Sequence, residues 1–407
     1  MVVWRTRAMA LQKRVVPSAV ENGREAAKRF KALGAVSKRF RGWRPQAEVI
    51  REVEAVPTCM PAYDVHNRVG GHPISRIALM HGPSNEGKTL VELALLKSFL
   101  ERGHFAAFAD AERSTPAKWV NSLLGEVAQS PGFVALPVKT FEHARDAIRS
   151  LCETVADARA KRELPDDVTA LVCVDSLRGL VPKAIFDELK KAQEADAAEG
   201  KQRGGRFGKK PKGIDGYGGR AAQMKAALLS AWMDECVPLF ADTRCALLLI
   251  GRETKVEAES GFRVITEDWK EYKVGGGVAP FFMASQVIRV TREYVRVKDS
   301  EGKSQVVGER HDLAMYKVKV SGKEDVAQYA YVHTSNGVQA PEGFDRARDV
   351  GALSVQLEVV KPHGSWLVRA DTGEAIAQGE EQLVKKLRAD PALAAELERQ
   401  CRGMVKP

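Results

Sequence analysis

The sequence predicts an α/β fold with a mostly parallel sheet that is covered by helices on both faces. Short apolar runs recur at residues 77–80, 105–109, 170–174 and 246–250. Continuous runs of this length are typical of parallel strands that are buried on both faces. A helix is predicted over residues 90–101, and further helix-forming segments separate the other runs, as in a βαβ chain. A glycine-rich loop directly follows the first run, in the position of a phosphate-binding turn.

The bulk composition is that of a globular protein of 407 residues, with 44% hydrophobic and 7% aromatic residues. This length predicts one large domain with smaller additions, or two domains. The longest apolar stretches fall well short of the roughly 20 residues of a membrane helix. The formal net charge of +10 favours a polyanionic partner, most often nucleic acid, although a solvated basic face would give the same number.

The six cysteines are scattered, without a CxxC pair or zinc-ligand spacing, and we interpret them as reduced thiols of a cytoplasmic protein. They are Cys59, Cys152, Cys173, Cys236, Cys245 and Cys401. The Arg-rich start has no apolar core of a signal peptide, and an organelle transit peptide is the alternative. We therefore expect a cytoplasmic protein.

Three parts are expected along the chain. Residues 1–50 contain twelve basic and three acidic residues, and within them residues 26–33 read as a basic helix. Residues 51–340 contain the strands and form the core. After a linker at residues 341–348, residues 350–407 form a small α+β domain.

Two polar stretches interrupt the core, and we expect long loops there, at residues 190–220 and 251–277. Residues 201–212 hold six basic residues and no acidic one. Loops of this length inside a compact domain are usually functional or disordered.

Residues 82–89 match the phosphate-loop pattern G-x-x-x-x-G-K-[ST] between a predicted strand and a predicted helix. Backbone N–H groups of such a loop surround phosphates, and the helix N-terminus adds a favourable dipole. Lys88 would neutralise the β- and γ-phosphates of ATP, and Thr89 would bind Mg²⁺. The residues expected at the nucleotide are Gly82, Pro83, Ser84, Asn85, Glu86, Gly87, Lys88, Thr89 and Leu90.

Two acidic residues follow other predicted strands. Asp175 ends the third strand and would serve Mg²⁺, directly or through water, unless it is a strand-end cap. Glu112 follows the second strand and could orient or deprotonate an attacking water, unless it is a solvated charge.

These motifs resemble the bacterial RecA recombinases in order and spacing, and the resemblance covers most of residues 20–405. The segments that carry it in the core are 70–77, 82–89, 107–112, 174–176, 181–184 and 276–285. In the tail they are 364–366, 373–379 and 387–391, and near the start the helix 26–40 resembles the polymerisation helix of that family. The resemblance implies a RecA-like P-loop ATPase core.

The resemblance also assigns roles to individual positions. Glu112 corresponds to the catalytic glutamate, and Trp119 to an aromatic residue that stacks on adenine. Lys317 and Lys319 correspond to lysines that reach the ATP of the neighbouring protomer, and Phe282 to an interface aromatic. On their own pattern, Trp119 and Phe282 could equally be core residues, and the two lysines could be the solvent face of a strand.

Contacts to DNA are expected from cations of both long loops, because phosphates attract cations and an inserted aromatic ring can separate bases. The first loop offers Lys201, Arg203, Arg206, Lys209, Lys210 and Lys212, with Phe207 among them. The second offers Lys255, Phe262, Arg263, Lys270 and Lys273. Arg220 and Gln223, on a helix after the first loop, would contact the DNA backbone. The alternative for the first loop is a solvated insertion.

Several positions depart from the RecA pattern. The glutamine that senses γ-phosphate after the fourth strand is missing, and Arg252 or Glu253 occupies its place as the switch. Ser84 replaces a glutamate, Glu86 adds one nearby, and Pro116 stands near an adenine-contacting acid. A phage-encoded member would suit these departures.

The expected function is that of an ATP-dependent recombinase. It would form helical homo-oligomers on single-stranded DNA, pair it with homologous double-stranded DNA and exchange strands, with ATP and Mg²⁺ as cofactors and with loader proteins as further partners. A hexameric RecA-fold helicase is the alternative, and a non-catalytic DNA-binding protein is the third hypothesis.

Overall fold

The computed structural model describes residues 28, 31–33, 52–136, 138–202, 214–255, 272–274, 278–298, 301–320, 325–332 and 343–404. The chain forms two units, Met1–Glu52 and Val53–Pro407. In the first unit the described residues are exposed, and Lys28 and residues 31–33 are helical. The second unit contains all the strands that the structure describes.

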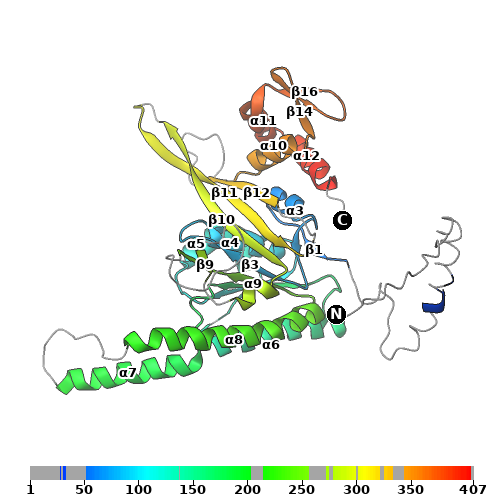
Figure 1. The fold of residues 1–407 in the computed structure, drawn as a ribbon. Coiled ribbons are helices and arrows are strands. Elements are labelled where there is room, and N and C mark those ends of the chain that lie inside the picture. The colour runs from blue at the N-terminus through cyan, green and yellow to red at the C-terminus, as the bar shows by residue number, and fades with distance from the viewer. Residues whose placement is uncertain are drawn as a thin grey trace, which may run out of the picture. The chain divides into compact units, whose positions relative to one another are not determined.

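A nine-stranded sheet forms the centre of the second unit, as Figure 1 shows. Five neighbouring strands are parallel and lie in the order β3, β7, β6, β4 and β5. Their bounds are Ile77–His81, Ala246–Ile250, Ala170–Asp175, Phe105–Asp110 and Phe133–Ala135. The expected α/β class and the four predicted strands are confirmed, because these apolar runs are buried on both faces.

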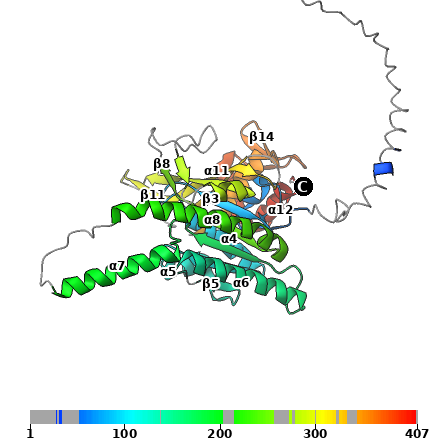
Figure 2. The same cartoon turned by 60° about the horizontal axis from the view of Figure 1, so that its bottom comes forward.

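Alternate residues of each parallel strand contribute to opposite cores. In β3, Ala78 and Met80 pack into the core that contains α4 (Lys88–Glu101), whereas Ile77 and Leu79 pack into the core of α6 and α8. This follows from the two-residue period of a strand. Helices α6 (Phe141–Ala160) and α8 (Ile214–Thr243) lie together along that face in Figures 1 and 2.

Four further strands widen the sheet beyond β3. Strand β10 (Gln286–Lys298) is parallel to β3 and antiparallel to β11 (Ser304–Val318), and together they form the long hairpin in Figure 1. Strand β12 (Asp325–Val332) and the short β13 (Gly343–Phe344) complete the edge. The hairpin lays β10 and β11 beside the loop that follows β3.

The first expected loop, residues 190–220, differs from our prediction, because most of it is helical. Helix α7 (Lys183–Gln202) and helix α8 project from the sheet as two long helices (Figures 1 and 2). Alanine, glutamate and lysine dominate residues 183–202, and these residues have high helix propensity. The glycine-rich and basic composition had obscured this signal.

The second expected loop, residues 251–277, begins and ends as paired strands. Strand β8 (Glu253–Lys255) pairs with β9 (Tyr272–Val274) in antiparallel register. The pairing brings the two ends of this segment together directly after β7.

The remaining elements flank the sheet. Near the start of the second unit lie β1 (Ala55–Val56), α3 (Pro61–His66) and β2 (His72–Pro73). Helix α5 (Ala117–Leu124) and a 3₁₀ helix (Gly125–Gln129) follow β4, and α9 (Ala279–Met283) precedes β10.

The C-terminal part contains three helices and a small antiparallel sheet. The helices are α10 (Arg346–Gln356), α11 (Gly379–Ala389) and α12 (Pro391–Gly403). The strands are β14 (Val360–His363), β15 (Trp366–Arg369) and β16 (Ala375–Ala377). Where we expect a linker, β13 pairs with β12 and Asp345 caps α10, so the connection is structured. Within the described ranges, every helix is too short or too polar to cross a membrane.

Candidate nucleotide site

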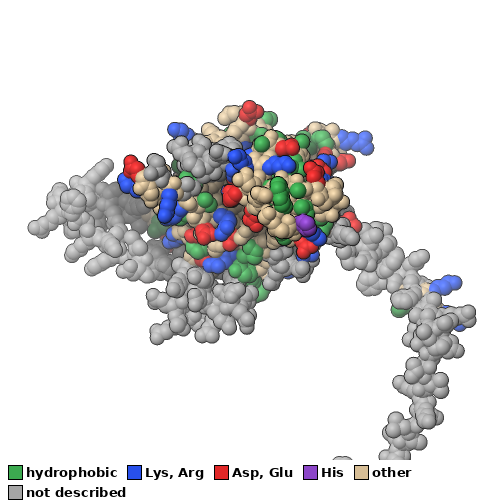
Figure 3. All heavy atoms as spheres, turned by 90° about the horizontal axis from the view of Figure 1, so that it is seen from above, with side chains coloured by type: hydrophobic (Ala, Val, Ile, Leu, Met, Phe, Trp, Pro, Cys, Tyr) green, Lys and Arg blue, Asp and Glu red, His purple; other side chains and the backbone are tan. Residues whose placement is uncertain are grey.

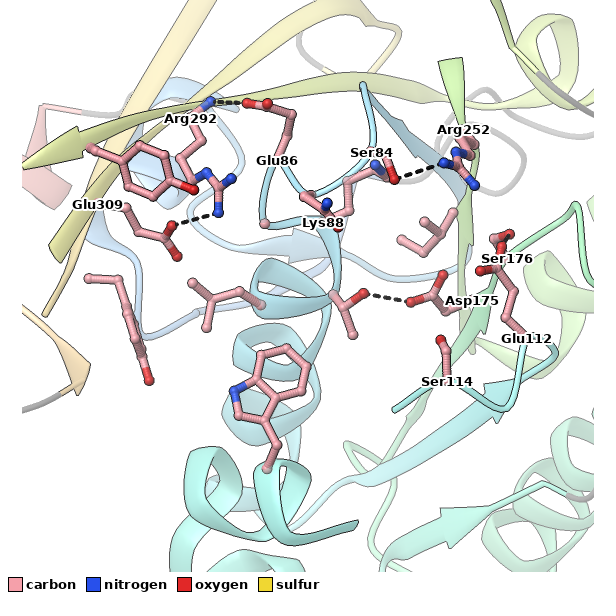
Figure 4. A pocket seen from close by; sticks show the side chains of 18 residues that line it. Ser84, Glu86, Lys88, Glu112, Ser114, Asp175, Ser176, Arg252, Arg292 and Glu309 are labelled. Carbon is pink, nitrogen blue, oxygen red and sulfur yellow. Dashed lines mark hydrogen bonds and ion pairs between the residues drawn. The ribbon is translucent and has the colours of Figure 1, made fainter. Parts of the chain in front are cut away.

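A cavity of about 640 Å³ lies at the carboxyl edge of the parallel strands. The phosphate loop enters it after β3, Glu112 after β4, Asp175 at the end of β6 and Arg252 after β7. Figure 4 shows these side chains around one space. The parallel arrangement explains the convergence, because the carboxyl ends of parallel strands share one edge.

The phosphate loop is packed tightly between α4 and the hairpin. Gly87 has a φ of 87°, and a Cβ there would lie 2.2 Å from a ring carbon of His311, so only glycine fits. Lys88 begins α4, and its Nζ donates to the carbonyl of Gly82 at 3.0 Å. Burial lowers the pKa of Lys88, against the opposing charge of Asp175.

Thr89 and Asp175 form the candidate Mg²⁺ site. The Thr89 hydroxyl donates to an Asp175 carboxylate oxygen at 2.7 Å. Burial raises the pKa of Asp175, and the hydrogen bond from Thr89 opposes that shift. A hydroxyl and a carboxylate are the hard oxygen ligands that Mg²⁺ prefers, together with phosphate oxygens and water, so these residues fit the ion.

A further acidic residue, Glu92, lies close to Asp175 and was not predicted from the sequence. Glu92 lies one turn along α4 from Lys88 and is fully buried. Burial, followed by the neighbouring Asp175, raises the pKa of Glu92 well above its usual range. A buried acid on the core face of a helix is recognisable in sequence only once the helix face is known.

Glu112 is held at the edge of the cavity by the turn that follows β6. The Ser176 hydroxyl donates to its carboxylate, and the backbone N–H of Ala111 donates to the carbonyl of Asp175 at 2.6 Å. Gly179 in the same turn lies against Ala111, where a Cβ would approach the Ala111 carbonyl carbon to 2.6 Å. The loop of Glu112 and the turn at 176–180 are therefore one packed unit.

Aromatic side chains line the other end of the cavity. Trp119, on α5, is 37% exposed and lines the cavity, so it is not a core residue. Tyr331 of β12 and Tyr294 of β10 also line it, and neither was identified from sequence. Their flat faces suit a nucleotide base.

Arg252 and Glu253, the two switch candidates, face different surroundings. Arg252 lines the cavity, and its guanidinium donates to the Ser84 hydroxyl at 2.9 Å (Figure 4). Glu253 is buried outside the cavity lining, where it contacts His81 Nδ1 at 2.7 Å and Arg289 Nε at 2.9 Å. Only Arg252 is therefore placed to meet a bound phosphate.

Glu86 adds a negative charge to an anion-binding loop, and a backbone N–H of the β10–β11 hairpin donates a hydrogen bond to its carboxylate. The backbone N–H of Arg292 donates to the Glu86 carboxylate at 2.6 Å, as Figure 4 shows. His311 lies 3.1 Å from the Glu86 carbonyl, and Glu309 pairs with Arg292 at 3.0 Å. These hairpin residues line or support the cavity and were missed, because their approach depends on long-range sheet pairing.

Lys317 and Lys319 lie away from this cavity, at the edge of the sheet formed by the amino-terminal ends of the parallel strands. The Lys317 ammonium donates to the carbonyls of Phe281 and Phe282 at 2.7 Å each. The Lys319 amide donates to Ser285, whose own amide donates to Ile77 at the start of β3. The length of β3 places Ile77 about 13 Å from the phosphate loop at the other end of the strand.

The same edge presents apolar surface. Phe282 is 60% exposed and Val278 is 51% exposed, so Phe282 is not a core residue. The structure thus brings Phe282, Lys317 and Lys319 together on one surface, separate from the cavity.

Most of the expected DNA-binding residues lie outside the described residues. These are Arg203, Arg206, Phe207, Lys209, Lys210, Lys212, Phe262, Arg263 and Lys270. Lys201 belongs to α7, Arg220 to α8, Lys255 to β8 and Lys273 to β9, and Gln223 is exposed on α8. Acidic and basic side chains are interspersed on the described face in Figure 3.

Comparison with known proteins agrees with this arrangement. A family model described as the RecA N-terminal domain matches residues 36–202, which include the phosphate loop, Glu112 and Asp175. The Protein RecA of Heliobacterium modesticaldum is 27% identical over 355 residues, covering 87% of this chain and 84% of that protein. The chain is thus similar to the RecA family in this region and to RecA proteins over most of its length.

Further RecA proteins align over similar lengths. The Protein RecA of Roseiflexus castenholzii is 24% identical over 352 residues, which cover 86% of this chain and 82% of that protein. The Protein RecA of Delftia acidovorans is 24% identical over 364 residues, with 88% and 81% covered. The similarity therefore extends beyond the phosphate loop to most of both chains.

Proposed function

We propose that this protein is a DNA-dependent ATPase that forms filaments on single-stranded DNA and exchanges it with a homologous duplex. One structural observation supports this proposal independently of the similarity to RecA proteins. The cavity and the pair Lys317 and Lys319 lie at opposite edges of one sheet. A head-to-tail assembly brings unlike edges of two protomers together, so one protomer's lysines can serve only another protomer's nucleotide.

In this proposal, the chain's own residues divide the hydrolytic chemistry. Glu112 takes a proton from water while the water oxygen bonds to the γ-phosphorus. The bond from that phosphorus to the bridging oxygen breaks, and ADP leaves with the bridging oxygen. Lys88 and Arg252 balance the phosphate charge from one side, and Lys317 and Lys319 of the next protomer do so from the other. Thr89 and Asp175 would hold Mg²⁺, which withdraws charge from the β- and γ-phosphates.

The distribution of charge supports DNA as the polymer that organises the filament. Residues 1–50 and 201–212 together hold eighteen basic and three acidic residues, whereas the rest of the chain has more acidic than basic residues. The positive charge is therefore concentrated in two segments. Binding through such segments releases counterions from DNA, so the affinity should fall steeply with salt.

The proposal is tested by ATP hydrolysis with and without single-stranded DNA, with Lys88→Ala as the control and with the same samples imaged. We expect DNA to increase hydrolysis, helical filaments to form, and Lys88→Ala to abolish hydrolysis. Filaments of the wild type are then tested for exchange of a labelled strand into a homologous duplex. Ring-shaped particles that unwind forks, or binding without hydrolysis, would contradict the proposal.

A further inference from the structure

We propose that Lys225 is a positioning residue that transmits the state of helix α8 to the catalytic Glu112. The inference rests on the proposed function, because it requires DNA to stimulate hydrolysis. It concerns a contact between a helix of the projecting pair and the turn beside the cavity.

The first step is the position of Lys225 on α8. This helix begins at Ile214 and carries Arg220 and Gln223, which we expect near DNA. Lys225 is two residues beyond Gln223 and is partly buried. A change in the position of the helix start would therefore displace the Lys225 side chain directly.

The second step is the contact that Lys225 makes. Its ammonium donates to the backbone carbonyl of Arg178 at 2.7 Å. Arg178 lies in the turn after β6, and its own N–H donates to the Ser176 hydroxyl at 3.3 Å. The ammonium therefore holds the turn by its backbone and not by a mobile side chain.

The third step joins the turn to the catalytic carboxylate. The Ser176 hydroxyl that receives the Arg178 N–H donates to Glu112, and Ser176 is only 2% exposed. Gly179 in the same turn is in tight contact with Ala111. A displacement of the turn must therefore move the loop of Glu112, because no space separates them.

Electrostatics support the proximity of the two groups. Burial lowers the pKa of Lys225 to about 8, and the Arg178 charge lowers it as well, whereas the Glu112 charge raises it. The ammonium thus interacts with the Glu112 carboxylate across the turn as well as through its hydrogen bonds. Contiguous packed groups of this kind can carry coupling between two sites.

The test compares Lys225→Met, Lys225→Gln and Lys225→Arg with wild type, by ATP hydrolysis at saturating single-stranded DNA and without DNA. Lys225→Met keeps the aliphatic stem and removes the ammonium. We expect the ratio of kcat with DNA to kcat without DNA to fall about tenfold in Lys225→Met. Lys225→Arg should restore most of that ratio, because a guanidinium can donate to the same carbonyl.

The matched control is Lys190→Met, which removes an exposed ammonium of α7 that forms a surface ion pair with Glu194 at 3.9 Å. It should keep the wild-type ratio. DNA affinity, measured by fluorescence anisotropy, should stay within about twofold in Lys225→Met, as expected for a residue without a phosphate contact. If Lys225→Met folds poorly, Lys225→Gln gives the same readout, because its amide is uncharged and one bond too short for the contact with the Arg178 carbonyl.

Three outcomes would overturn the inference. One is an unchanged ratio in Lys225→Met and Lys225→Gln, and another is equal loss of both rates without rescue by Lys225→Arg, which indicates a structural role. The third is a loss of DNA affinity that accounts for the whole effect. If instead wild type shows no DNA stimulation, the proposed function fails before Lys225 is tested.

Discussion

Arg252 and Glu253 show how two neighbouring residues can have unrelated surroundings. Arg252 lies between β7 and β8, and Glu253 begins β8. Arg252 meets the cavity, and Glu253 meets His81 and Arg289. From sequence, either could have replaced the family's glutamine, because the strand register could not be counted across a departure in residue type.

Arg252→Ala should lower the DNA-stimulated kcat by about a hundredfold, because one preorganised donor to the transferring phosphate is lost. The affinity for ATP should fall by less than about tenfold, since Lys88 and the loop amides remain. Steady-state kinetics and nucleotide titration measure the two effects separately.

Arg149→Ala provides a control for Arg252→Ala, because Arg149 forms an exposed ion pair with Glu235 on the far helices. Its kcat should match that of the wild type. A kcat for Arg252→Ala close to the wild-type value would show that this guanidinium does not act on the phosphate.

At the scale of elements, the sequence predicted the parts whose pattern is local. The four apolar runs and the phosphate loop have the expected positions, since burial on both faces leaves a continuous apolar signal. The long strands β10 and β11 were missed because charged residues alternate along them. Arg292 and Glu309 reach the cavity through the pairing of those strands, which no local pattern reveals.

The C-terminal helices dock on the core through a buried ion pair. Arg402 of α12 pairs with Asp64 of α3 at 2.5 Å and also donates to the Thr58 carbonyl. Asp64 is fully buried and accepts two further hydrogen bonds from Thr58. The pair therefore connects α3, near the start of the second unit, with α12 near its end.

Arg402→Met should destabilise the protein by about 3–5 kcal/mol, because it leaves the Asp64 carboxylate buried without its cation. Combining it with Asp64→Asn should recover part of that loss. Thermal unfolding of both variants measures the change. Lys361→Met, which removes an exposed pair between Lys361 of β14 and Glu358 before that strand, is the control and should cost no more than about 1 kcal/mol.

The stability that depends on Asp64 should also vary with pH. Burial raises the pKa of Asp64 to about 6, although Arg402 opposes the shift. A folded-state pKa above the unfolded one favours the folded state at low pH, and this contribution is lost as the pH rises through about 6. The stability of wild type relative to Asp64→Asn should therefore decrease between pH 5 and pH 7. An increase over that range would contradict the assigned direction.

At the scale of the whole molecule, the two edges of the sheet carry different chemistry. One edge holds the cavity, and the other presents Phe282 with Lys317 and Lys319. The phosphate-loop pattern predicted the first set and the resemblance to RecA proteins predicted the second, but the distance between the two sets follows only from the fold.

Mixing two inactive variants tests whether the lysines act between protomers. Lys88→Ala protomers keep Lys317 and Lys319, whereas protomers with Lys317→Ala and Lys319→Ala keep the cavity. In an equal mixture, about one quarter of the interfaces should be complete, because each junction takes one half from each protomer. ATP hydrolysis should then exceed the sum of the two separate preparations. A mixture no more active than that sum would show that the lysines do not act in trans.

The separation of the two edges also has a consequence for the ends of such an assembly. A head-to-tail polymer has two unlike ends. At one end, the last cavity has no neighbour to supply lysines, so its nucleotide should persist. At the other end, every cavity is complete and the last lysines are idle. ATP hydrolysis should therefore be slower at one end of the filament than at the other. Because the two ends then differ in bound nucleotide, subunits should be added and lost at different rates at the two ends.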